Sequence, residues 1–150
     1  MENNKIENPQ NDPQIEKVVY TAKTHTTGGR DGGSSRTSDG YLDIKLSVPG
    51  TPGNGTNPEQ LFAAGWSACF FSSLKIAAAK KRVRFPADAA VNAEVDLCLT
   101  GDDYTIQARL NVSLPGLDLE VAWELSEAAH LICPYSKATH GNIKVETNLV

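Results

Sequence analysis

The fold is decided by residues 57–71, which read NPEQLFAAGWSACFF. Asn57 is a favourable helix N-cap, Pro58 suits the first helical position, and Glu59 places an acid in the first turn. The residues that follow are apolar on nearly every helical face, which is typical of a helix in the interior of a domain. We therefore predict a central helix that begins at Pro58 and continues to about Lys81.

Alternating apolar and polar residues predict strands on both sides of this helix. The predicted strands are 18–26 and 42–48 before the helix, and 91–99, 104–114 and 143–149 after it. A second helix is predicted over residues 119–132, where apolar residues recur at helical spacing. The order ββ-α-ββ-α-β predicts an α+β fold, in which antiparallel strands are segregated from two main helices.

The two strands before the central helix are predicted to form a hairpin with a long loop. Residues 27–40 contain five glycines and end on a Ser-Asp-Gly turn signal. Arg30 lies within this loop. Loops of this length usually carry a function or are disordered, so Arg30 is a candidate functional residue.

Length, composition and charge limit the classes of protein to consider. A chain of 150 residues is expected to form one domain, and a net charge of −4 argues against nucleic acid or an anionic membrane as a partner. The longest apolar stretch, 61–79, is interrupted by serines and a lysine, so no membrane span is expected. Residues 1–17 are polar and lack the apolar core of a secretory signal. We expect them to form a flexible N-terminal arm before a single domain over 18–150, in a cytoplasmic protein.

Two cysteines stand in different surroundings and suggest dithiol redox chemistry. Cys69 lies in the apolar central helix, and Cys133 follows the second helix and precedes a proline. A buried thiol is inert unless a cation stabilises its thiolate. Arg30 can supply the cation, and Glu59 can hold it in place. The expected compartment is reducing, and an odd number of cysteines cannot all pair within one chain. Any disulfide is therefore expected to be transient.

Other interpretations of these residues remain open at this level. Each cysteine alone could be a packed core residue, and Cys98, on the polar face of its strand, is expected to be a bystander. A zinc site is disfavoured because no CxxC spacing occurs and the three histidines are scattered. His130 and His140 flank Cys133, which leaves a cysteine hydrolase as a weak alternative.

Five short motifs in a fixed order carry a family resemblance. They are Gly28-Gly29-Arg30-Asp31-Gly32, Ser38-Asp39-Gly40, 57–65, Ser67-Ala68-Cys69-Phe70 and Cys133-Pro134-Tyr135-Ser136. Together they resemble the organic hydroperoxide resistance (Ohr) branch of the Ohr/OsmC family of thiol peroxidases, over nearly all of 18–150. Lys137 stands where the Ohr pattern has asparagine and is similar to the OsmC branch.

The resemblance implies a mechanism and partners. Cys69 would be the peroxidatic cysteine and Cys133 the resolving cysteine, while Arg30 would stabilise the thiolate and Glu59 would orient the arginine. The family forms intertwined homodimers with an active site at each end of the interface. It binds no cofactor, reduces organic hydroperoxides in protection against oxidative stress, and is itself reduced by a lipoylated protein or dihydrolipoamide.

The aromatic residues near the cysteines predict substrate preference. An apolar collar is expected from Phe62, Trp66, Phe70, Phe71 and Tyr135, and would favour alkyl hydroperoxides over H2O2. The alternatives are an OsmC-type peroxidase with broader peroxide use and a non-catalytic redox sensor or binding module.

Overall fold

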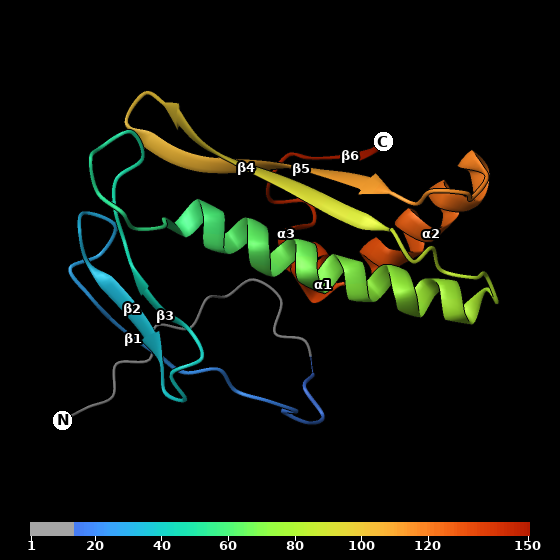
Figure 1. Cartoon of the computed structure of the whole chain (residues 1–150), viewed down its shortest axis with the longest axis horizontal. Coiled ribbons are helices and arrows are strands. Elements are labelled where there is room, and N and C mark those ends of the chain that lie inside the picture. The colour runs from blue at the N-terminus through green and yellow to red at the C-terminus, as the bar shows by residue number, and fades with distance from the viewer. Residues whose placement is uncertain (1–13) are drawn as a thin grey trace.

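The computed structural model describes residues 14–150 (Figure 1). Most of the expected N-terminal arm, residues 1–13, therefore lies outside the described residues. Residues 14–23 form no helix or strand, and regular structure begins at Thr24.

The described chain contains six strands and three helices. In order they are β1 (Thr24–Thr27), β2 (Ser34–Thr37), β3 (Asp43–Lys45), α1 (Pro58–Lys80), β4 (Ala90–Thr100), β5 (Asp103–Ser113), α2 (Leu119–Ile132), α3 (Pro134–Thr139) and β6 (Val145–Leu149). Two three-stranded sheets form, in the orders β1-β2-β3 and β4-β5-β6. The predicted α+β class and both main helices are confirmed. The strands are not all antiparallel, because β6 pairs with β5 in parallel.

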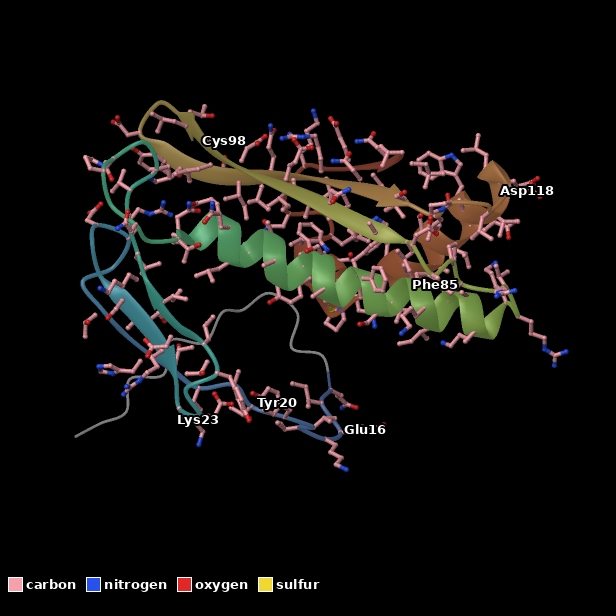
Figure 2. All side chains as sticks on the ribbon, viewed as in Figure 1. Glu16, Tyr20, Lys23, Phe85, Cys98 and Asp118 are labelled. Atoms are coloured by element: carbon pink, nitrogen blue, oxygen red, sulfur yellow. The ribbon has the colours of Figure 1, made fainter. Side chains whose placement is uncertain are left out.

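The region before α1 differs from its prediction. The strand expected over 18–26 is limited to β1, and Val18, Val19 and Tyr20 are exposed rather than paired. Figure 2 shows Tyr20 below the sheets and away from the core. Strand β2 lies inside the segment expected to be a loop. The strand was not predicted because its sequence, Ser-Ser-Arg-Thr, has no apolar alternation.

Arg30 consequently lies in a short turn between β1 and β2 rather than at an oversized hairpin tip. Gly28 and Gly29 adopt positive φ angles of 71° and 62°, which favour glycine. The N–H of Gly33 donates to the carbonyl of Gly29 at 3.0 Å and closes the turn. A Cβ atom on Gly33 would lie 2.1 Å from the carbonyl oxygen of Thr27, so only glycine fits there.

Helix α1 is the centre of the core, as its sequence predicts. The side chain of Asn57 caps it by accepting from the N–H of Gln60 at 2.9 Å. Trp66, Phe70 and Leu74 recur every four residues and are fully buried. They belong to one core cluster with buried residues of β5 and α2, and α1 itself contacts β4 and α2. One face of α1 is covered by the second sheet, while β1–β3 lies beside the N-terminal end of the helix (Figure 1).

The expectation that no stretch is long enough to span a membrane is wrong by length and composition. Among residues 14–150, α1 is the one helix that meets both conditions, with 23 residues and an 18-residue window of mean hydropathy 1.4. A single helix of this kind is weak evidence for a membrane span, because the core helix of a folded domain has the same properties. The position of α1 between the second sheet and α2 agrees with a core helix.

The β4–β5 hairpin extends beyond the part of the core that buries it. Val91, Ala93 and Val95 face the core, but Leu97 and Leu99 on the same face are 45% and 59% exposed. Tyr104, opposite Leu99 across the hairpin, is 66% exposed. The alternating pattern predicts burial along the whole strand, so this single chain leaves the end of an apolar face uncovered.

Candidate active site

The two thiols predicted to react lie together at the contact of α1 with α2 and α3. Cys69 is at the middle of α1 and is half-buried, whereas Cys133 is fully buried. Cys133 ends α2 and starts α3 with an extended backbone at ψ 119°, and Pro134 is the first residue of α3. The Cys133 thiol is near enough to Cys69 to act on the pKa of its thiol, so the two residues are placed as the proposed disulfide partners.

The immediate surroundings of Cys69 keep it protonated. Burial raises the pKa of the Cys69 thiol, and its bond with Cys133 raises that pKa further. The main-chain N–H of Tyr135 donates to the Cys69 sulfur and lowers the pKa, but this effect is the smaller one. The thiol therefore needs an additional positive charge before it can react rapidly at neutral pH.

Arg30 and Glu59 also lie together, as a two-pronged ion pair. Arg30 Nη2 donates to Glu59 Oε1 at 2.7 Å, and Nη1 donates to Oε2 at 3.1 Å. The bonds from Arg30 lower the pKa of Glu59, so the carboxylate is ionised at neutral pH. Glu59 is in the first turn of α1, and Arg30 reaches it from the β1–β2 turn.

The ion pair and the thiol pair are separated along α1. Glu59 and Cys69 are ten residues apart, which corresponds to about 15 Å along a helix axis. Arg30 is not among the described groups that shift the pKa of Cys69. The structure thus brings the four predicted residues together as two pairs, and a single chain does not unite the pairs.

A cavity of about 830 Å³ opens beside the ion pair. Its walls include Arg30, Glu59, Ala63, Val95, Leu97 and Tyr104. Neither Cys69 nor Cys133 lines it. The cavity is mostly apolar, and Leu97 and Tyr104 at the uncovered end of the β4–β5 hairpin form part of its wall.

The predicted aromatic collar is only partly formed. Phe62 contacts Tyr135 edge to face at 5.9 Å between ring centres, on the N-terminal side of Cys69. Trp66 and Phe70 are fully buried in the core, and Phe71 packs instead against Phe85, with ring centres 5.4 Å apart. These three rings are therefore packed in the core or against Phe85, which leaves Phe62 and Tyr135 to form the collar.

Gly65 allows the ring of Tyr135 to lie against α1. A Cβ atom at Gly65 would be 2.7 Å from the Tyr135 hydroxyl oxygen and 3.2 Å from the ring carbon that bears it. Gly65 is one helical turn before Cys69, so the ring lies over the same face as the thiol. Gly65 belongs to the 57–65 motif, but the role of this glycine depends on Tyr135, which lies 70 positions later.

One feature of the site was not found from the sequence. It is the set of hydrogen bonds through Ser136 that links His130 and Trp66 beside Cys133. Cys98 stays outside the site: it is half-buried near the hairpin end of β4 (Figure 2).

Within residues 14–150, no three His, Cys, Asp or Glu side chains cluster in a way that would hold a metal ion. The described residues offer a thiol pair and, farther along α1, an arginine–carboxylate pair. An α+β fold with one cysteine in its central helix and a second cysteine beside it is the arrangement of a dithiol redox protein.

Comparisons with known proteins agree with this class and make it specific. The family model of OsmC-like proteins matches residues 50–148. The organic hydroperoxide resistance protein of Xanthomonas axonopodis pv. citri is 43% identical over 138 residues, covering 89% of this chain and 96% of the relative. The protein OhrB of Bacillus subtilis is 40% identical over 137 residues, covering 88% of this chain and 98% of the relative.

The fold comparison gives the same result. The crystal structure of Bacillus subtilis OhrB matches with a TM-score of 0.83 and 39% identity, covering 89% of this chain and all of the solved chain. The chain belongs to the Ohr/OsmC family and is a homologue of the organic hydroperoxide resistance proteins.

Proposed function

We propose that the protein is a cysteine-based, lipoyl-dependent peroxidase that reduces organic hydroperoxides to alcohols. The observation that carries this proposal is the placement of Cys69 beside Cys133 at the junction of α1, α2 and α3. Membership of the organic hydroperoxide resistance family gives the reaction class. The apolar ring pair Phe62–Tyr135 beside Cys69 favours a substrate with an organic group.

The reaction has two steps on the protein. The Cys69 thiolate attacks the distal peroxide oxygen, the O–O bond breaks, and the alkoxide leaves as an alcohol after taking a proton. Cys69 is then a sulfenic acid. The sulfur of Cys133 attacks that sulfur, an S–S bond forms, and the hydroxyl group leaves with the thiol proton as water. A dithiol reductant, a dihydrolipoyl group, restores both thiols by exchange.

The cation that activates Cys69 is proposed to come from a partner subunit. Within one chain Arg30 is bound to Glu59, which lies about three helical turns before Cys69 on α1. Two features support a second copy at this place: the uncovered apolar end of the β4–β5 hairpin, and the cavity beside the ion pair. In a homodimer with α1 of each subunit facing the other, the Arg30–Glu59 pair of one chain completes the thiol pair of the next.

The cell location that fits this chemistry is the cytoplasm. A thiol pair that must return to the reduced state after each turnover requires a reducing compartment with dithiol donors. The proposed partners are organic hydroperoxides, dihydrolipoamide or a lipoylated protein, and a second copy of the chain.

The test is peroxide consumption by purified protein with dihydrolipoamide. We expect rapid loss of cumene hydroperoxide, slower loss of H2O2, and no loss of either with Cys69→Ser. Cys98→Ser is the matched control, because this half-buried cysteine lies outside the site and should leave the rate unchanged. Equal rates with the two peroxides would indicate an OsmC-type peroxidase. No turnover by the wild type, despite a reducible Cys69–Cys133 disulfide, would indicate a sensor or binding protein.

A further inference from the structure

A chain of side-chain hydrogen bonds joins four elements around Cys133. Trp66 Nε1 of α1 donates to Ser136 Oγ of α3 at 3.2 Å. Ser136 Oγ is 2.9 Å from His130 Nδ1 of α2, and His130 Nε2 is 2.8 Å from Thr147 Oγ1 of β6. The mechanism proposed above uses none of these groups.

A neutral His130 fits the donors and acceptors of this chain. An indole N–H can only donate, so Ser136 Oγ accepts from Trp66. The Ser136 hydroxyl proton is then available for His130 Nδ1, and in that tautomer Nε2 carries the histidine proton and donates to Thr147. A neutral imidazole satisfies every group, and burial lowers the pKa of His130, which favours the same state.

The hydrogen bond from Ser136 to His130 encloses the segment that carries Cys133. His130 precedes Cys133 by three residues and Ser136 follows it by three, so their contact ties the two sides of the α2–α3 junction together. Ser136 is 6% exposed, and Trp66 and Cys133 are fully buried. Phe70 also packs on the imidazole, with ring centres 4.6 Å apart.

The same segment faces Cys69. The junction holds the Cys133 thiol, which raises the pKa of Cys69, and the N–H of Tyr135, which lowers it. Trp66 is three residues before Cys69 on α1, so the bond from its indole to Ser136 links the helix of the first cysteine to the segment of the second. A displacement of this segment would separate the two sulfurs without changing the fold of either helix.

We propose that His130, acting through Ser136, is a positioning residue that holds Cys133 in place for the step that closes the disulfide. The inference rests on the proposed peroxidase function and concerns only its second step. In that step the Cys133 sulfur bonds to the Cys69 sulfur, the S–O bond of the sulfenic acid breaks, and water leaves with the Cys133 thiol proton. Cys133 sulfur is oxidised and Cys69 sulfur is reduced, so no further reactant is needed.

A positioning role has a distinctive consequence for the lifetime of the enzyme. The sulfenic acid on Cys69 is either closed by Cys133 or oxidised irreversibly to sulfinic acid by a second peroxide. Correct placement favours the intramolecular reaction, and small displacements reduce it strongly. Loss of the network should therefore change the balance between closure and over-oxidation, while the first reaction with peroxide stays the same.

The test uses Ser136→Ala with Ser126→Ala as its matched control. Both serines are buried, but the Ser126 hydroxyl donates only to the carbonyl of Ala122 within α2. Rapid mixing with cumene hydroperoxide and intact-mass analysis measure the sulfenic, disulfide and sulfinic forms over time. We expect Ser136→Ala to form about tenfold more sulfinic acid per turnover, as the loss of one shared buried hydrogen bond predicts. Its first oxidation rate and the behaviour of Ser126→Ala should match the wild type.

A second pair of variants keeps the test decisive if Ser136→Ala folds poorly. Asparagine at His130 places an amide near the Nδ1 position and preserves the Ser136 partner, while glutamine places it near Nε2 and preserves the Thr147 partner. His130→Asn should therefore retain most of the wild-type closure rate, and His130→Gln should over-oxidise as Ser136→Ala does.

The outcomes separate the inference from the proposed function. A wild type that consumes no peroxide contradicts the proposed function; the inference is then tested by the rate at which diamide closes the Cys69–Cys133 disulfide in the same variants. A wild type that turns over, together with Ser136→Ala and His130→Gln that close as fast as Ser126→Ala, overturns the inference alone.

Discussion

The thiol pair and the ion pair each have one member on α1, but they are held in different ways. Cys69 and Cys133 are fixed by packing among α1, α2 and α3, with Cys133 fully buried. Arg30 is carried by the turn between β1 and β2, whose strands have four residues each and are largely exposed. Cys69 and Cys133 therefore belong to the core, and Arg30 lies at the edge of the core.

This difference suggests that disulfide formation and reactivity towards peroxide depend on different parts of the molecule. The dithiol can form a disulfide within one folded chain, since its geometry depends only on that chain. The proposed activation of Cys69 requires a positive charge, and the same chain binds Arg30 to Glu59, about three helical turns before Cys69 on α1. Reactivity towards peroxide should therefore depend on assembly, whereas disulfide formation by an unselective oxidant should not.

The largest effect is expected on peroxidase activity when two inactive subunits are mixed. If Arg30 acts across the interface, a dimer of one Cys69→Ser chain and one Arg30→Met chain contains one intact site. Random co-expression should then restore about a quarter of wild-type peroxidase activity, because half of the dimers are mixed and each has one working site of two. Each variant alone should be nearly inactive, and a mixture as inactive as its components would show that Arg30 acts within its own chain.

A second effect concerns the ionisation of Cys69. Without the guanidinium, burial and Cys133 raise the thiol pKa, so less thiolate is present at neutral pH. The pH at which Cys69 alkylation by iodoacetamide reaches half its maximum should move upwards in Arg30→Met, with about tenfold slower reaction at pH 7 for each unit. Peptide mass analysis identifies the alkylated cysteine. Arg36→Met, in β2 of the same sheet, is the control and should leave the profile unchanged.

A smaller effect is expected at the thiol end from Gly65→Ala. The new methyl group displaces the Tyr135 ring from its place beside Cys69. The ratio of kcat/KM for cumene hydroperoxide to that for H2O2 should fall about threefold to tenfold, the value of one aromatic contact. Tyr135→Phe in the Gly65→Ala background removes the closest atom and should recover part of the ratio. An unchanged ratio in Gly65→Ala would show that this ring does not select the substrate.

The smallest effect is expected on the outer face of the second sheet, away from both pairs. Arg109 donates to Asp96 at 2.7 and 2.8 Å and lowers the pKa of that exposed carboxyl. A lowered folded-state pKa stabilises the fold above the unfolded value, about 4, and this contribution is lost as the pH falls through the folded value. Asp96→Asn should lower Tm at pH 7 by about 2 °C, with a difference that shrinks on acidification. A difference that grows towards acid pH would contradict this assignment.

Features that depend on neighbouring residues could be predicted from the sequence. The cap of α1 is an example, because Asn57 and Gln60 are three residues apart and form the expected hydrogen bond. Helix α2 matches its predicted range, since its apolar spacing reflects a single buried face. The residues Cys69, Cys133, Arg30 and Glu59 were found through motifs, and each pair does form.

Features that depend on distant partners could not be predicted. Strand β2 is polar and exposed, so its pairing with β1 and β3 leaves no periodic signal. Leu97 fits a buried strand by alternation, but its exposure depends on where the helices end. The contact of His130 with Ser136 is local in sequence, yet its meaning depends on Trp66 and Thr147, which come from other elements.

The parallel pairing of β6 with β5 also has a consequence for how the chain folds. Parallel neighbours require a crossover connection, and here α2, Cys133 and α3 make up that crossover. Such non-local pairing forms slowly, because the closure of the long connecting segment costs entropy before its contacts form. The sulfur pair should therefore be assembled late, and refolding chains should acquire a rapidly closing disulfide only when the C-terminal strand has joined the sheet.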